Sequence, residues 1–166
     1  MDTEKNSKIM RWSFVGLSII YIITMLIICT IANGKIDVVA QAISEESTLQ
    51  FSTLSDIQKP LATTNIIFFV VLLGVALWLY SQGSKKVLTY IPTAIFAVFT
   101  LFCYVALSGS FFSLGSGNPT TSGSYWLMFF IGIFFIAGAI TINVIATMAV
   151  RNLLKRTRPE IEKNSK

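Results

Sequence analysis

The sequence predicts an all-α membrane protein in which four transmembrane helices form an antiparallel bundle. Of its 166 residues 54% are apolar and only 13% are charged, and the mean hydropathy is +0.70. A soluble domain of this size exposes much of its chain and needs a more polar surface. The apolar residues are gathered into four solid runs of helical length, which favours helices over the alternating strands of a membrane β-barrel.

The first predicted span covers residues 12–32 and follows an N-terminal tail of residues 1–11. It holds eleven Leu, Ile, Val or Phe residues and no charged residue. At roughly 0.3–0.6 kcal/mol each, these residues favour insertion by several kcal/mol. The run is longer than the apolar core of a cleaved signal peptide, so we expect it to be retained as a helix.

The second predicted span covers residues 63–82, and eleven of its central fifteen residues are strongly apolar. The polar residues at its start, Asn65 among them, offer side-chain oxygens for an N-cap. Pro60 is expected to mark the turn before this helix, because proline disrupts a helix interior. Residues 83–86 form a short polar turn after it.

The third and fourth predicted spans cover residues 87–108 and residues 125–150. Pro92 in the third span is expected either to kink the helix or to mark its first turn. The fourth span has twenty-six residues without a charge. That length exceeds a perpendicular crossing, so we expect this helix to tilt or to project from the membrane. Short connections favour antiparallel neighbours.

The distribution of charge predicts that both termini are cytoplasmic. The N-terminal tail, the turn at 83–86 and the C-terminal tail of residues 151–166 carry eleven basic and four acidic residues, a net charge of +7. The other two connections, residues 33–62 and 109–124, carry two basic and four acidic residues, a net charge of −2. Short segments rich in Lys and Arg remain in the cytoplasm. The Ile- and Lys-rich composition without histidine favours a bacterial plasma membrane.

The two predicted external loops differ in character. In residues 33–62, apolar residues recur at helical spacing on both sides of a break at residues 44–52. We expect two short amphipathic helices that either lie on the membrane surface or form a docking surface for a partner. Residues 109–124 are rich in Gly, Ser and Thr, so we expect a mobile loop with Phe111 and Phe112 at the membrane interface.

Small and weakly polar residues recur at steps of three or four along the third and fourth spans. Small residues let helices approach closely, and hydroxyls or amides bond across the interface. The residues that we expect to mediate helix packing or partner contact are Thr93, Thr100, Tyr104, Gly132, Ala139, Asn143 and Ala146. The small and weakly polar residues of the third span form one stripe along the helix. Alternatively, this stripe lines a path for a neutral solute. An unpaired amide in hydrocarbon is costly, so Asn143 is expected to bond to Thr100 or to a second subunit.

Cys29 and Cys103 are expected at similar depth near the outer ends of their helices. If the first and third helices touch, a disulfide between the two cysteines is geometrically feasible. The commoner alternative is that both are small apolar residues with free thiols.

Composition argues against most catalytic functions. A chain without histidine lacks imidazole acid–base chemistry and the commonest zinc ligand. No Asp, Glu, Lys or Arg lies within a predicted span, whereas ion-coupled transporters and proton pumps normally need such groups. We therefore predict no catalytic, metal-binding or cofactor-binding residue. The basic excess flanks apolar runs and indicates topology rather than nucleic-acid binding.

The predicted function is a non-catalytic accessory or scaffolding subunit that binds a larger membrane complex of the transport, secretion, envelope or immunity type. The alternative is a homo-oligomeric channel or facilitator for a small or neutral solute; a lipid-modifying enzyme would need a better nucleophile and base. The expected partners are the lipid bilayer, another membrane protein or a second copy, and anionic lipid headgroups at the basic C-terminal tail.

Overall fold

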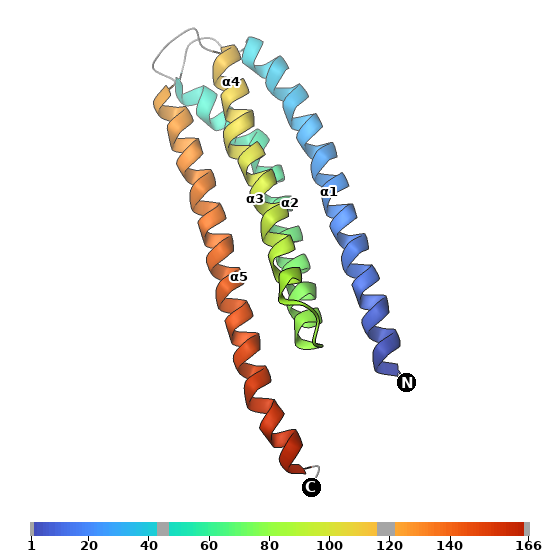
Figure 1. Cartoon of the computed structure of the whole chain (residues 1–166). Coiled ribbons are helices and arrows are strands. Elements are labelled where there is room, and N and C mark those ends of the chain that lie inside the picture. The colour runs from blue at the N-terminus through green and yellow to red at the C-terminus, as the bar shows by residue number, and fades with distance from the viewer. Residues whose placement is uncertain (1, 43–46, 116–121, 165–166) are drawn as a thin grey trace.

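The structure is a computed structural model that describes residues 2–42, 47–115 and 122–164. All regular elements in these ranges are helical (Figure 1). Four helical stretches within them are long and apolar enough to cross a membrane: Lys8–Ile36, Ser52–Ser81, Lys86–Ser113 and Tyr125–Lys155. The predicted all-α class, with four helices long and apolar enough to span a membrane, is therefore confirmed for the described residues.

Helix α1, Asp2–Ala42, is a single helix of 41 residues. At 1.5 Å per residue it measures about 60 Å, about twice the thickness of the hydrocarbon core. It continues well past Ala32, where we predicted the first span to end. The apolar spacing persists through Ile36, which is fully buried, and packing against α2 therefore extends the helix beyond the predicted span.

Helix α2, Ser47–Ser81, passes through Pro60, so the prediction of a turn at this proline is wrong. A proline in a helix interior removes one hydrogen bond, that of the carbonyl four residues earlier. This carbonyl belongs to Asp56, an exposed residue, so water can replace the lost bond. Leu54 and Leu61 on either side of Pro60 are fully buried, and their packing offsets the cost of the proline.

The predicted external loop at 33–62 is thus mostly a continuation of the first two helices rather than two separate short helices. Because α2 begins at Ser47, the break is shorter than the predicted 44–52. Residues 43–46 lie outside the described residues.

The third span is one helical run whose hydrogen-bond pattern changes along its length. It consists of the 3-10 turn η1 (Lys86–Tyr90), α3 (Ile91–Leu101), the π-helical turn η2 (Phe102–Ala106) and α4 (Leu107–Gly115). Pro92 lies in the first turn of α3, where no backbone N–H is needed.

Helix α4 extends into the segment 109–124, which we predicted to be a mobile loop. Phe111 and Phe112 are 1% and 7% exposed and belong to the core, so their predicted place at the membrane interface is wrong. The burial of two aromatic rings outweighs the weak helix propensity of the Gly and Ser residues around them. Residues 116–121 lie outside the described residues.

Helix α5, Ser122–Asn164, has 43 residues and extends past both predicted ends of the fourth span. The predicted C-terminal tail is therefore helical as far as Asn164. Figure 1 shows α1 and α5 on opposite sides of the bundle, with α2 and the third span between them. Helix α1 packs mainly on α2 and α4, whereas α5 packs mainly on α3, η2 and α2.

The turn after α2 reverses the chain at the end of the bundle where α1 begins and α5 ends, which we call the terminal end (Figure 1). Gly83 has a φ of 86°, a left-handed conformation that favours glycine. The N–H of Gly83 donates to the Tyr80 carbonyl at 3.1 Å, and that of Ser84 donates to the Leu79 carbonyl at 3.0 Å. These two bonds form a Schellman motif that ends α2. The opposite end is called the loop end below.

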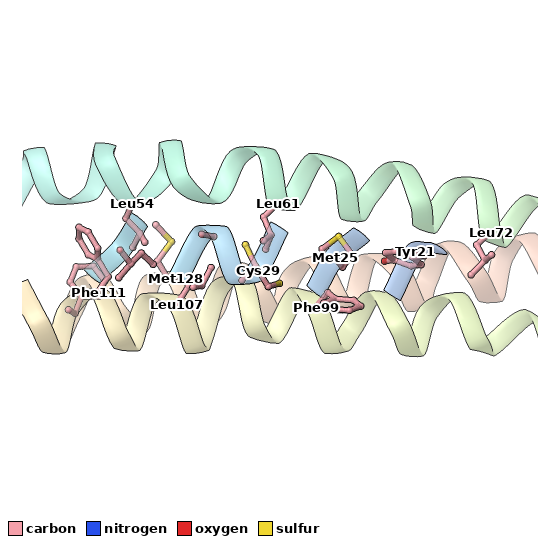
Figure 2. Close-up of a cluster of buried hydrophobic side chains, with 14 of the residues drawn as sticks. Tyr21, Met25, Cys29, Leu54, Leu61, Leu72, Phe99, Leu107, Phe111 and Met128 are labelled. Carbon is pink, nitrogen blue, oxygen red and sulfur yellow. The ribbon is translucent and has the colours of Figure 1, made fainter. Parts of the chain in front are cut away.

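The core is a long seam that runs between the helices. Figure 2 shows Tyr21, Met25 and Cys29 of α1 between the ribbons of α2 and the third span. A second, smaller cluster joins α2, α3 and α5 through Phe69, Leu73, Phe96 and Ala139. Large apolar side chains on the outer faces of α1 and α5, such as Trp12 and Phe134, are more than three-quarters exposed. Such an exterior suits a lipid environment.

Candidate functional site: amide clusters and surface grooves

The amide of Asn143 joins α5 to the start of the third span near the terminal end. Its Nδ2 donates to the Thr89 carbonyl at 2.8 Å and to Thr93 Oγ1 at 2.7 Å. Its Oδ1 accepts from Thr147 Oγ1 at 3.1 Å. The predicted partnership with Thr100 is therefore wrong, but the expectation that this amide is paired is met within the chain.

A second amide, that of Asn65, joins three helices near the middle of the bundle. The hydroxyl of Tyr21 on α1 donates to Asn65 Oδ1, and Asn65 Nδ2 donates to Thr100 Oγ1 at 3.0 Å and to the Phe96 carbonyl at 3.3 Å. The ring of Tyr21 stacks on Phe68 with centroids 4.9 Å apart. Asn65 is 2% exposed inside α2, so our prediction that it caps the helix is wrong.

The third amide, that of Gln58, bonds to the π-helical turn η2 toward the loop end. The N–H of Leu107 donates to the carbonyl of Phe102, five residues earlier. An α-helix would direct this N–H to the carbonyl of Cys103 instead. The released Cys103 oxygen accepts from Gln58 Nε2 at 2.7 Å, and Ser108 Oγ lies 3.1 Å from the same nitrogen.

The bonds of Gln58 and Asn65 were missed because the predicted second span began at residue 63, which left Gln58 in a loop and placed Asn65 at the start of the helix. The buried face of α2 includes Leu54, Gln58, Leu61, Asn65 and Leu72 at steps of three, four or seven. Extending the apolar period backwards from Leu72 through Leu61 places both amides on this face.

The remaining predicted packing residues lie mostly inside the bundle. At Gly132, α5 approaches η2 closely, since a Cβ there would lie 2.9 Å from Tyr104 Cβ. Ala139 is buried in the smaller core cluster, whereas Ala146 is half-buried. Tyr104 also stacks on Phe135, with centroids 5.5 Å apart.

Cys29 and Cys103 are both buried in the main core cluster and are free thiols. The structure therefore has the second of the two predicted alternatives, apolar packing without a disulfide. Cys103 Sγ lies 4.0 Å from the Gln58 carbonyl oxygen, which adds a weak contact between η2 and α2.

Buried polar atoms are paired almost throughout the described helices. The exception among the described side chains is Ser84 Oγ, which is buried at the turn after α2 without a hydrogen-bond partner. The described residues contain no group of three or more Cys, Asp or Glu side chains that could hold a metal ion. The arrangement of the three amides thus holds four helices in one register and offers no clustered reactive groups in the described part of the chain.

Among the hollows that the described residues form, three have volumes of about 450–540 Å³. The loop-end groove, about 540 Å³, lies between α1 and α2 and is lined by Ile28, Ile31, Lys35, Val38, Asp56 and Ile57, among others. The glycine groove, about 450 Å³, lies between α2 and α5, where Gly74 and Gly138 leave open space. The basic pocket, about 530 Å³, lies at the terminal end and is lined by Tyr80, Ser81, Gln82, Gly83, Arg151, Leu154 and Lys155.

Comparison with family models, curated proteins and solved structures gave no match for this chain.

Proposed function

We propose that the protein is a non-catalytic accessory or scaffolding subunit of a plasma membrane, with the terminal end in the cytoplasm, that binds a larger membrane complex. The observation that carries this proposal is that buried polar side chains form hydrogen bonds to other helices of the same chain. Three amides, those of Gln58, Asn65 and Asn143, fasten the spans to one another at three depths. A bundle whose helices are held together by such hydrogen bonds is suited to presenting surfaces of fixed shape to a partner.

The same observation weighs against the alternative, a channel lined by the third span. Thr93 and Thr100 are 8% and 1% exposed, and each hydroxyl accepts an amide N–H from a neighbouring helix. A solute path along this stripe would have to break these bonds and leave buried donors unpaired, at about 1–3 kcal/mol each.

The proposed docking surface is the loop-end groove. Its walls are the last residues of the predicted first span and the extensions of α1 and α2 past the predicted spans. Its lining is mainly apolar, with Lys35 and Asp56 as its charged members. Val38 lies beyond the membrane-length stretch of α1 and is 70% exposed. An apolar side chain in this position favours contact with an apolar extracytoplasmic segment of another membrane protein.

Photo-cross-linking in native membranes tests the proposal. A photoreactive phenylalanine at position 38 is expected to give one stoichiometric adduct with another membrane protein, and the same group at Ile20 is expected to give none. Ile20 is a matched control because it is exposed on the same helix within the membrane-length stretch. Gly34→Trp should abolish the adduct, because position 34 has open space and lines the groove.

Two results would overturn the proposal. One is the lack of any adduct at position 38 in native membranes. The other is flux of a neutral solute through liposomes that hold this protein alone, with loss of flux in Thr100→Leu. An adduct between two copies of the chain would replace the hetero-complex by a homo-oligomer.

A further inference from the structure

The basic pocket gathers positive charge at the level where α2 leaves the predicted membrane span. The end of α2 and the turn after it, residues 80–83, form one wall, and Arg151, Leu154 and Lys155 of α5 form the other. Arg151 and Lys155 are four residues apart, so their side chains lie on one face of α5 and line the same hollow. No acidic residue is among the described residues that line it.

The chemistry of the lining selects for an anion with several oxygen atoms. The guanidinium of Arg151 can donate two parallel hydrogen bonds to a phosphate, and the Lys155 ammonium adds a second positive charge. Tyr80 and Gln82 supply a hydroxyl and an amide on the opposite wall. Both cations are exposed, so an anion can reach them without a change in the helices.

The location of the pocket favours a lipid over a soluble anion. The membrane-length stretch of α2 ends at Ser81, and that of α5 ends at Lys155. We therefore expect the pocket at the membrane interface, where phospholipid phosphates lie and where Tyr and Trp side chains such as Tyr80 and Trp78 are enriched. Negative lipids of the cytoplasmic leaflet attract basic residues at this level.

We propose that the basic pocket binds the phosphate of one anionic phospholipid in the leaflet at the terminal end, with Arg151 and Lys155 as its ligands. The bound headgroup connects the end of α2 to α5. At this level one wall of the pocket is the turn after α2 and the other wall is α5 alone. This site is distinct from the loop-end groove, and it does not depend on the proposed partner.

Native mass spectrometry of the full chain, released from vesicles of equal parts phosphatidylglycerol and phosphatidylcholine, tests this site. We expect one phosphatidylglycerol to be retained at least tenfold more often than phosphatidylcholine. Arg151→Gln with Lys155→Gln should reduce this preference to parity. Arg151→Lys should lose part of it, because an ammonium lacks the paired donors of a guanidinium.

The matched control is Lys85→Gln with Lys86→Gln. It removes two positive charges from the same end of the bundle, but neither residue lines the pocket. Each basic residue near an anionic leaflet contributes about fivefold to diffuse membrane attraction. Equal loss in both double variants would therefore indicate diffuse attraction and overturn the site.

Two further outcomes would also overturn the proposal. One is equal retention of the two lipids by the unmodified chain. The other is displacement of the retained lipid by millimolar inorganic phosphate, which would identify a soluble anion as the ligand. A helical circular dichroism spectrum that is unchanged in each variant confirms that the comparison is made between folded proteins.

Discussion

The side-chain amide of Gln58 on α2 donates a 2.7 Å hydrogen bond to the backbone carbonyl of Cys103 in η2. This carbonyl is available because the π-helical turn directs the N–H of Leu107 to Phe102 instead. The irregular turn and the buried amide therefore stabilise each other, and neither is favourable alone in hydrocarbon.

Replacing Gln58 by Leu is expected to destabilise the bundle by about 1–2 kcal/mol, because it leaves the Cys103 carbonyl without its donor. Thermal denaturation in mild detergent measures the effect. Gln82→Leu, at an exposed amide of the same chain, is the control and should change stability by about 0.5 kcal/mol or less. Equal melting temperatures for Gln58→Leu and the unmodified chain would show that the π-helical turn does not need this bond.

Tyr21 and Asn65 are expected to be energetically coupled. Tyr21→Phe removes the hydroxyl that donates to Asn65 Oδ1, and Asn65→Leu removes the acceptor together with the bond to Thr100. A double-mutant cycle should give a coupling energy of about 0.5–2 kcal/mol, since the two residues share one network. Strictly additive losses would mean that α1 is held by its apolar contacts alone.

Gly132 and Gly138 on α5 are expected to respond oppositely to alanine. A Cβ at Gly132 would lie 2.9 Å from Tyr104 Cβ, whereas a Cβ at Gly138 meets nothing within 4 Å. Gly132→Ala should therefore destabilise the bundle by about 1–3 kcal/mol through overpacking. Gly138→Ala should be neutral or stabilising by up to about 1 kcal/mol, because alanine is the better helix former. Similar melting temperatures for both variants would contradict the close approach of α5 to η2.

Ser84→Ala is expected to stabilise the protein by about 1 kcal/mol. The Ser84 hydroxyl is buried without a partner, and burying an unpaired hydroxyl costs free energy that alanine avoids. Chemical denaturation in detergent provides the measurement, with Ser81→Ala as its counterpart. Because Ser81 Oγ donates to the Trp78 carbonyl at 2.6 Å, Ser81→Ala should not be stabilising. A loss of stability in Ser84→Ala would indicate that its hydroxyl has a partner.

The ends of the helices were harder to predict than their cores. Helix α1 continues past Ala32 and α2 passes through Pro60 because Ile36, Leu54 and Leu61 pack between the two helices. Local signals such as a proline or a glycine-rich segment indicate where a helix ends in isolation. They were overridden here by burial, and the same holds for Phe111 in α4.

The candidate site was predictable in kind but not in partners. The stripe on the third span and Asn143 were recognised as groups that bond across helices. The choice of Thr93 rather than Thr100 as the partner of Asn143 depends on the lengthwise offset between α3 and α5, which no local pattern encodes. Thr100 accepts instead from Asn65, which lies in the interior of α2 rather than at its start.

What the sequence determined by itself is the number of membrane-length helices. The free energy of insertion is a sum over the residues of one segment, and each apolar run satisfies its own backbone hydrogen bonds without help from the others. Only the tertiary structure decided which side chains face one another, where each helix ends and which amide bonds to which carbonyl. These features depend on contacts between segments as far apart as Gln58 and Cys103, and their free energies arise only when the helices are packed side by side.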